Sequence, residues 1–331
     1  LSGSYMDEQA TALKTGQKTY TGSAKVYTKI ANTLRVGGML DVNMRDNKSF
    51  FATDSRENPF EWSIYTTRAQ NAFDENGNYN HLYYTGEKYN FMENREFGWR
   101  NSKNFGIRGT VDVEWKPLRS LMFTSLFSFA NQHTSEEDVA TENSYFVKQR
   151  KKDIFTTVDY VAVNLWTDGG YRKGKSINNN SITLRNQVSW MPVINADHRF
   201  DVMAGQEIRK SRFEDETTEI YGYVHDRGHQ QVPQFALMEY LGVPYWRQSL
   251  NETAAVSYFG TTGYTYKNRY TVSFNARTDG SNRFGLKTNQ LFQPLWAVGL
   301  NYQLKEENFF ANKDWLSYLT LRASYGSQGN V

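Results

Sequence analysis

Apolar and polar side chains alternate with a period of two along most of this chain. In residues 26–44 the even-numbered positions are mostly apolar, whereas charged side chains such as Arg35 and Asp41 occupy odd-numbered positions. Successive side chains of a β-strand point to opposite faces, so the pattern predicts strands with one apolar and one polar face. Because this stretch is longer than a usual strand, we expect a tight turn at Ala31, Asn32 and Thr33 to divide it into two antiparallel strands.

The same hairpin pattern recurs further along the chain. Short turns are predicted at residues 116–120, 191–197 and 267–269, each with alternating runs on both sides. Pro117 suits the first of these turns, because proline cannot donate to a strand ladder. With the alternating runs near the C-terminus, the chain is expected to form about a dozen antiparallel strands.

Long polar segments, rich in glycine, asparagine and aromatic residues, alternate with the short turns. They comprise residues 45–104, 131–180, 210–252 and 279–293. Such long loops are uncommon in compact domains, whereas β-barrels of the bacterial outer membrane combine short periplasmic turns with long extracellular loops. We therefore expect an all-β fold, an antiparallel transmembrane β-barrel, with its short turns in the periplasm and its long segments outside the cell.

The aromatic content favours the same fold. The chain holds 22 Tyr, 21 Phe and 8 Trp, which is 15% of its residues, although its mean hydropathy is only -0.70. Outer-membrane barrels place aromatic girdles where their strands leave the hydrocarbon. We assign five residues to such girdles: Trp115, Trp190, Tyr266, Tyr270 and Tyr302. No apolar run approaches the roughly 20 residues that a membrane-spanning helix needs.

Charge and cysteine content exclude several other classes of protein. Lys and Arg total 38 against 35 Asp and Glu, and this net charge of +3 comes without a basic block, which argues against binding to nucleic acid. The chain has no cysteine, and therefore no disulfide, no thiolate metal site and no cysteine nucleophile.

The alternation also assigns individual side chains to the two sides of a barrel wall. The residues expected to face lipid are Ile30, Leu34, Val36, Leu40, Val111, Val113, Leu184 and Val202. The charged residues expected to face the lumen are Lys29, Arg35, Asp41, Arg108, Asp112, Glu114, Arg277 and Arg322. These charges either contact a plug domain or a substrate, or serve only to solvate the interior.

A soluble β-sandwich or solenoid, acting as a glycan-binding module, also shows this alternation. It fits less well, because a sandwich rarely has one face this charged and long loops on one side only. Both ends of the chain stop inside the strand pattern, and an open barrel leaves unpaired strand edges in lipid. We therefore expect residues 1–331 to be an internal part of a longer barrel.

Three segments near the C-terminus carry the most specific motifs: TVSFNARTDGSNRFG at residues 271–285, QPLWAVGLNYQLKEENFF at 293–310 and WLSYLTLRASYGSQGN at 315–330. They resemble the barrel of one known family, the SusC/RagA-like TonB-dependent outer-membrane transporters. LSGSYMDE at the start, DENGNY at 74–79, DVEWKPLRSLMF at 112–123 and VMAGQEIRKSRFE at 202–214 agree with it. The resemblance therefore spans nearly the whole chain, through several independent segments.

This resemblance implies a function and partners. Such a transporter is a plugged outer-membrane barrel of about 22 strands that imports bulky nutrients, either oligosaccharides or peptides. It works with a SusD-like surface lipoprotein and draws energy from the TonB-ExbB-ExbD system through its N-terminal region. Residues 1–331 are then a partial barrel domain, about half of the whole, which lacks the N-terminal plug domain. A passive porin and a siderophore-type receptor barrel are the alternative functions.

Clusters of reactive side chains give no sign of catalysis. His225, Asp226 and His229 lie close together in sequence, but surface clusters of this kind are usually turns, so we assign no metal. The loop at Asp74 lacks the glycine and glutamate spacing of a calcium site. The chain also lacks the phosphate-binding and hydrolase motifs. We therefore expect no enzymatic activity and no cofactor.

Aromatic residues of the long segments are the candidate substrate-binding residues. Flat rings can stack on sugar faces or peptide side chains, while neighbouring polar groups set the orientation. Alternatively, the same rings pack the loops together, brace the lipoprotein or form the upper girdle. The candidates are Trp62, Tyr65, Tyr83, Tyr84, Trp99, Trp166, Tyr171, Tyr221, Tyr223, Tyr245 and Trp246.

Overall fold

One antiparallel sheet dominates the computed structural model. The structure describes residues 1–53, 57–67, 70–84, 86–154, 156–158, 161–192, 194–226, 228–284, 292–311 and 315–327. The 12-stranded sheet contains β1 (Ser2–Gln9), β2 (Gly16–Ala31), β3 (Leu34–Phe50), β6 (Gly98–Leu118), β7 (Leu121–Ala140), β10 (Gly170–Trp190), β11 (His198–Val224), β12 (Gln230–Gln231), β13 (Trp246–Tyr266), β14 (Tyr270–Ser281), β15 (Gln293–Gln303) and β16 (Thr320–Ser327).

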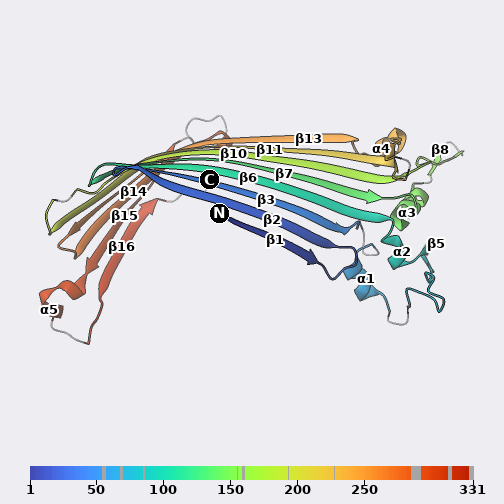
Figure 1. The fold of residues 1–331 in the computed structure, drawn as a ribbon, viewed down its shortest axis with the longest axis horizontal. Helices are drawn as coiled ribbons and strands as arrows, with labels where there is room; N and C mark the ends of the chain where they lie inside the picture. Colours follow the sequence, from blue (N-terminus) through green and yellow to red (C-terminus); the bar gives the residue numbers. More distant parts are fainter. Residues whose placement is uncertain are drawn as a thin grey trace.

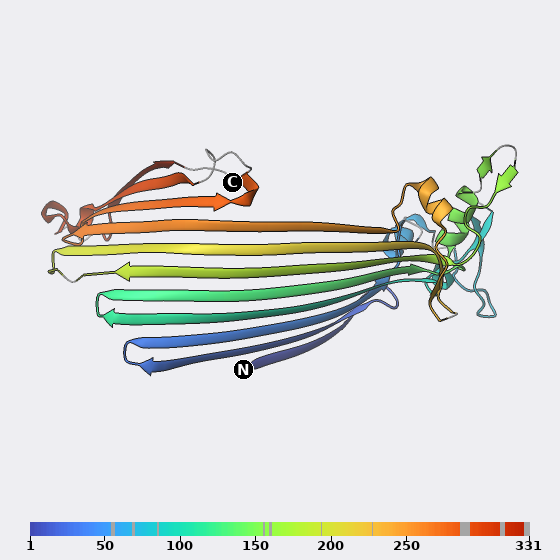
Figure 2. The ribbon, with the colours of Figure 1, turned by 90° about the horizontal axis from the view of Figure 1, so that it is seen from above.

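Each long strand pairs with the strand that precedes it in the sheet and the strand that follows it. The order is β1-β2-β3-β6-β7-β10-β11-β13-β14-β15-β16, with β12 added to β11. The strands run side by side in an arched sheet, and β1 and β16 form its two edges (Figures 1 and 2). The predicted all-β, antiparallel fold is therefore confirmed, and the sheet is open within the described residues.

The remaining elements lie mainly at one end of the sheet (Figure 2). We call this the loop end, and the opposite end, where the hairpins close, the turn end. The loop end contains two small sheets, one of β4 (Leu82–Tyr84) with β5 (Glu87–Tyr89) and one of β8 (Thr156–Val158) with β9 (Val161–Val163). It also contains four short helices: α1 (Pro59–Tyr65), α2 (Phe91–Asn94), α3 (Tyr145–Asp153) and α4 (Phe235–Leu241). The 3-10 turn η1 (Asn282–Phe284) follows β14, while η3 (Leu304–Glu306) and α5 (Asn308–Ala311) lie between β15 and β16. No helix of the described residues is long and apolar enough to span a membrane.

All four predicted short turns connect neighbouring strands at the turn end. The turn at Asn32 joins β2 to β3, and the turn after Leu118 joins β6 to β7. Between β13 and β14, Lys267 and Asn268 adopt positive φ angles of 49° and 55°. This left-handed pair matches the twist of a tight hairpin, which is why so short a connection suffices.

The strands extend further into the long segments than the sequence pattern predicts. Within the expected loop of residues 131–180, β7 continues to Ala140 and β10 begins at Gly170. Polar pairs replace apolar ones there: Asn131 Nδ2 donates to Asn180 Oδ1 at 2.5 Å, and His133 Nδ1 lies 2.7 Å from Asn178 Oδ1. Backbone ladders do not need apolar side chains, so the alternation fades where both faces meet water while the strands go on.

The register separates the predicted lipid-facing residues from the predicted lumen-facing residues. Val36 pairs with Val113 across β3 and β6, and the adjacent Arg35 pairs with Glu114. Neighbouring pairs along a ladder point to opposite faces. We call the face that carries Val36 and Val113 the apolar face, and the face that carries Arg35 and Glu114 the polar face. Continued through the other strands, the same registers place the predicted lipid-facing residues on the apolar face, apart from Ile30 at a bulge, and the predicted lumen-facing residues on the polar face.

Candidate functional site at the loop end

Three of the four short helices described at the loop end, α1, α2 and α3, begin at a local capping residue. The Ser144 Oγ accepts a hydrogen bond from the Val147 N–H at 3.2 Å and starts α3. Asn58 and Asn90 cap α1 and α2 in the same way, and Gly242 ends α4 with a φ of 65°. These caps satisfy amide groups that a helix terminus leaves without partners. Each helix is therefore held in place by its own few residues as well as by packing.

A buried cluster joins α3 and α4 to the ends of the long strands. Val147 and Leu237 are fully buried, and they pack with Ala140, Tyr171 and Tyr221 of the strands and with Phe51, which directly follows β3. Those strand residues alternate with the apolar-face positions and so belong to the polar face. The connections of the loop end therefore fold over the polar face of the sheet.

Three predicted binding aromatics, Trp166, Tyr171 and Tyr221, lie inside this cluster. Trp166 is 0% exposed and packs edge-on against Tyr221, with 5.0 Å between ring centroids. Tyr171 is 6% exposed, and its hydroxyl donates to Glu219 Oε1 at 2.9 Å. Tyr221 and Tyr223 are each only 4% exposed. All four rings hold the loop end together and offer little surface to a ligand.

A second aromatic group connects α1 and α2 to α3. Trp62 packs edge-on against Tyr89 at 5.1 Å and stacks on Phe91 at 6.2 Å between ring centroids. Tyr89 in turn meets Tyr145 of α3 at 5.0 Å. Trp62 is half-buried within this chain of rings. The group ties the segment between β3 and β6 to the buried cluster on the polar face.

Exposed rings remain at the rim of these two groups. Tyr65 at the end of α1 and Tyr83 in β4 are each 72% exposed, and Tyr245 is 38% exposed. Tyr245 lies 5.9 Å from Phe235 of α4 between ring centroids. The side chain of Tyr84 lies outside the described residues. Of the predicted aromatics on the loops, Tyr65 and Tyr83 offer the most open ring surface.

Two further candidates point away from the polar face. The register places Trp99 and Trp246 in line with apolar-face positions of β6 and β13. Trp99 packs edge-on against His225 at 4.6 Å, and the Trp246 indole Nε1–H donates to Glu216 Oε1 at 2.8 Å. These rings therefore sit on the outer side of the loop end.

Near Trp99, two histidines face one another. The His225 and His229 rings lie 4.8 Å apart, and the Tyr223 hydroxyl is 2.8 Å from His229 Nδ1. Across the described residues, no three His, Cys, Asp or Glu side chains are grouped in a way that suits a metal ion. The loop at Asp74 is a turn, in which Oδ1 accepts the Asn78 and Asn76 N–H groups at 2.8 and 2.9 Å. The bond from Asn78 contributes most to holding the pKa of Asp74 below its usual value.

Charged side chains of the polar face form local pairs along the strands. Arg35 donates to Glu114 at 2.9 Å and lies over the Tyr27 ring at 5.3 Å. Gly37 permits this arrangement, because a Cβ there would lie 2.4 Å from the Tyr27 ring. Asp41 and Arg108 stand opposite one another in the register.

Three more of the charged residues predicted to face the lumen, Arg277, Arg322 and Asp112, also lie next to polar or charged side chains. The Arg277 guanidinium donates to Asp279 at 2.9 Å and to Ser257 at 3.0 Å. Arg322 donates to the Tyr318 hydroxyl at 3.2 Å, and Asp112 lies 4.0 Å from Arg35. The polar face is thus lined by charges that are largely balanced locally.

The turn end contains a cluster of polar side chains that the sequence pattern does not indicate. Glu307, after η3, accepts hydrogen bonds from the hydroxyls of Tyr270 at 2.5 Å and Tyr302 at 3.1 Å. Arg269 lies 3.4 Å from its other carboxylate oxygen. These groups, with Tyr270 foremost, hold the pKa of Glu307 below its usual value. Tyr270 and Tyr302 were predicted as girdle residues, but their partner Glu307 lies in the connection between β15 and β16, which the alternating pattern does not describe.

Sequence comparisons match the chain to receptors of one kind. No protein-family model matches it. The TonB-dependent receptor P26 of Formosa agariphila is 21% identical over 335 residues, which cover 98% of this chain and 30% of the receptor. The TonB-dependent receptor SusC of Bacteroides thetaiotaomicron is 42% identical over 74 residues, or 22% of this chain and 7% of that receptor. These relatives are receptors and not enzymes.

Solved structures share the fold. The RagAB peptide importer in its "closed-closed" state superposes with a TM-score of 0.75 and 19% identity, over 99% of this chain and 34% of that chain. Another structure of the RagAB peptide transporter gives 0.72 and 18%, over 94% and 33%. The chain thus spans about a third of the length of these relatives. Sequence and fold agree: both match this chain to a barrel segment of SusC-like TonB-dependent transporters, which are β-barrel proteins of the bacterial outer membrane.

Proposed function

We propose that this segment forms part of the outer wall and the outer vestibule of an importer for bulky nutrients, either oligosaccharides or peptides. The complete transporter captures its substrate at the loop end and passes it along the polar face. A SusD-like surface lipoprotein assists capture, and the TonB-ExbB-ExbD system supplies energy through the N-terminal region and its plug domain. In this arrangement the loop end is extracellular and the turn end is periplasmic.

One observation carries the proposal. The loop end is a folded assembly over the polar face, with a buried cluster beneath and exposed rings at its rim. Tyr65 and Tyr83 are the exposed rings on these connections, and in this proposal they are the first to contact a ligand that enters from the loop end. Exposed rings on a rigid support suit the stacking of sugar faces or peptide side chains.

The similarities to known proteins support the partners and the direction of transport. The receptors of similar sequence are named as TonB-dependent, and RagAB is named as a peptide importer. The names alone leave both substrate classes open for this chain. We therefore include both classes in the experiment.

The test measures uptake by cells that produce the full-length transporter. Tagged oligosaccharide and peptide pools are supplied separately, and the variant Tyr65→Ala with Tyr83→Ala is compared with the unaltered protein. We expect the substrate concentration that gives half-maximal uptake to rise about tenfold or more for one pool, since each stacked ring contributes about 1 kcal/mol. Trp246→Ala is the matched control, because its ring is exposed at the same end but on the outer side. The control should take up substrate normally.

Collapse of the proton gradient tests the energy source in the same cells. Uptake should stop, because TonB coupling depends on that gradient. Uptake that continues unchanged would identify a passive porin. Normal uptake by the double variant, with a folded barrel on heat-modifiable gels, would instead assign Tyr65 and Tyr83 to loop packing.

A further inference from the structure

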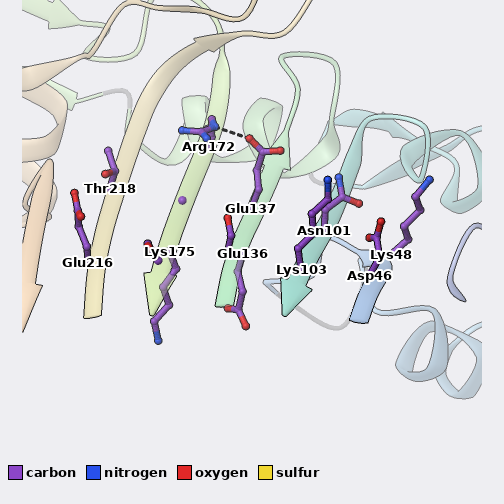
Figure 3. A pocket seen from close by; sticks show the side chains of 13 residues that line it. Asp46, Lys48, Asn101, Lys103, Glu136, Glu137, Arg172, Lys175, Glu216 and Thr218 are labelled. Atoms are coloured by element: carbon purple, nitrogen blue, oxygen red, sulfur yellow. Dashed lines mark hydrogen bonds and ion pairs between the residues drawn. The ribbon is translucent and has the colours of Figure 1, made fainter. Parts of the chain in front are cut away.

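A polar depression of about 640 Å³ lies near the loop end, across β3, β6, β7, β10 and β11. Its lining includes Lys48, Lys103, Asn101, Ser135, Glu137 and Arg172. Figure 3 shows Lys48, Asn101, Lys103, Glu137 and Arg172 rising from one side of the sheet, whereas Glu136 and Lys175 point to the other side. Most of the lining therefore belongs to a single face.

That face is the apolar face, which the barrel presents to the membrane. On β6, Lys103 shares its side with Phe105 and Val111, and on β3, Lys48 shares its side with Met44. The lining residues are thus continuous with the lipid-facing positions of the same strands. A substrate that travels through the lumen does not pass this surface.

On β3 and β6, the depression begins where the apolar side chains end. Lys103 is two residues beyond Phe105, so the two positions are about 7 Å apart along the strand. Asp46 follows Met44 at the same spacing on the neighbouring strand, and Asp46 pairs with Lys103 in the register. Because the outward-facing side chains change there from apolar to polar, we place this edge of β3 and β6 at the level of the lipid headgroups.

The charges of the depression are only partly compensated. The Arg172 guanidinium donates to Glu137 at 2.7 Å, and Glu216 accepts the Trp246 indole N–H. Lys48 and Lys103 are exposed, and neither forms an ion pair within the described part of the chain. Two adjacent strands therefore present exposed ammonium groups beside one carboxylate, Asp46, and beside neutral hydrogen-bonding side chains such as Asn101 and Ser135.

We propose that this depression binds the phosphorylated sugar headgroup of a glycolipid in the outer leaflet. Lys48 and Lys103 attract the phosphate, because cationic side chains next to a membrane bind anionic headgroups. Asn101, Ser135 and Glu137 hydrogen-bond the sugar hydroxyl groups further along the strands. The assignment to the outer leaflet rests on the extracellular position of the loop end in the proposed function.

The experiment uses the purified full-length transporter in detergent micelles and measures its affinity for fluorescent, bisphosphorylated lipid A. Lys48→Gln with Lys103→Gln should weaken binding about tenfold or more. Each lysine near such a surface contributes about 1 kcal/mol, and a loss of about 1.4 kcal/mol corresponds to a tenfold weaker affinity. Arg45→Gln with Lys173→Gln is the matched control, because both side chains lie on the polar face and neither lines the depression. It also removes two positive charges at the same level, and its affinity should be unchanged.

Further ligands show which part of the glycolipid is bound: the phosphate, the sugar or the acyl chains. Dephosphorylated lipid A and phosphatidylglycerol should each bind about tenfold more weakly than bisphosphorylated lipid A, since one lacks the phosphate and the other lacks the sugar. The deacylated headgroup and inorganic phosphate separate a lipid ligand from a soluble one. A deacylated headgroup or phosphate that binds as tightly as the lipid would overturn the glycolipid assignment.

Equal affinity of the Lys48/Lys103 variant and the unaltered protein for lipid A would overturn the site itself. Heat-modifiable gel mobility shows that each variant is folded, and the single variant Lys103→Gln replaces the double variant if the latter does not fold. Uptake is not measured here, so a negative result leaves the import proposal standing.

Discussion

The loop end and the strand band between the two ends of the sheet are stabilised in different ways. At the loop end, Trp166 and Leu237 are completely buried by the protein itself. In the strand band, Val26 on the apolar face is 67% exposed. The comparison shows that the loop end carries its own small core, whereas the strand band needs hydrocarbon to cover its apolar side chains.

The difference implies that the two regions respond separately to mutation. Damage to the buried cluster should loosen the loop end and leave the strands paired. Damage to the apolar face should disturb membrane insertion and leave the cluster intact. Each of the following predictions tests one side of this separation, in order of decreasing effect.

The largest expected effect is loss of the loop-end core. Trp166→Ala should destabilise this region locally by about 3–5 kcal/mol, because it removes a fully buried indole and leaves a cavity. External protease on intact cells should then cut within residues 131–180 or 210–252 more readily, while heat-modifiable mobility stays that of a folded barrel. Trp246→Ala, which removes a half-exposed ring, is the control.

If the Trp166→Ala variant no longer forms a barrel, then the loop end and the strand band fold as one cooperative unit, and their proposed separation is wrong. Cleavage of the unaltered protein from outside only at the turn end would reverse the proposed sidedness.

A charge in the middle of the strand band should have the next largest effect. Val111→Arg places a guanidinium on the apolar face and should cost about 2–4 kcal/mol, because the group must be removed from water. Ser135→Arg lies on the same face beyond the apolar residues and should cost about 1 kcal/mol or less. Folding of the full-length chain into lipid vesicles, followed in urea, measures both changes.

Equal cost at the two positions would show that Val111 does not contact hydrocarbon. Thiol-accessibility labelling of cysteines placed at Val36 and Arg35 provides a second measurement. It should find the first position shielded from water and the second accessible.

The smallest expected effect concerns Glu307 at the turn end. Its pKa is lowered in the folded protein, so its contacts with Tyr270 and Tyr302 contribute stability above its unfolded pKa. This contribution is lost as the pH falls through the lower, folded pKa. Hydrogen exchange of residues 304–311 should therefore be slow near pH 7 and faster in acid, relative to a turn-end hairpin such as that at Asn32.

Glu307→Gln should remove most of this acid dependence, because the amide has no charge to lose. The same pH response in the Gln variant would show that Glu307 does not anchor the connection.

Several features of the fold were predictable from local pattern. The turns at Asn32 and Asn268, the pairing of apolar positions such as Val36 and Val113, and the polar face with Arg35 all follow from a period of two. A strand with one wet and one lipid-covered face leaves this trace in the sequence, whatever its distant neighbours are.

The extent of the strands was less predictable. The expected loops of residues 131–180 and 210–252 proved to be largely strand, because β7, β10, β11 and β13 continue beyond the apolar alternation. Short helices such as α3 were also missed, although Ser144 is a local start signal. With so few residues, a helix carries too little periodicity to be recognised against a strong strand pattern.

The sequence alone determined that aromatic residues gather in the long connections, since residue type and position suffice for that statement. Tertiary structure alone decided that Trp166 is buried, that Tyr65 and Tyr83 are exposed, and that Trp246 faces outward. The physical reason is that the exposure of a ring depends on which other segments fold onto it, and at the loop end those segments lie far away in the sequence.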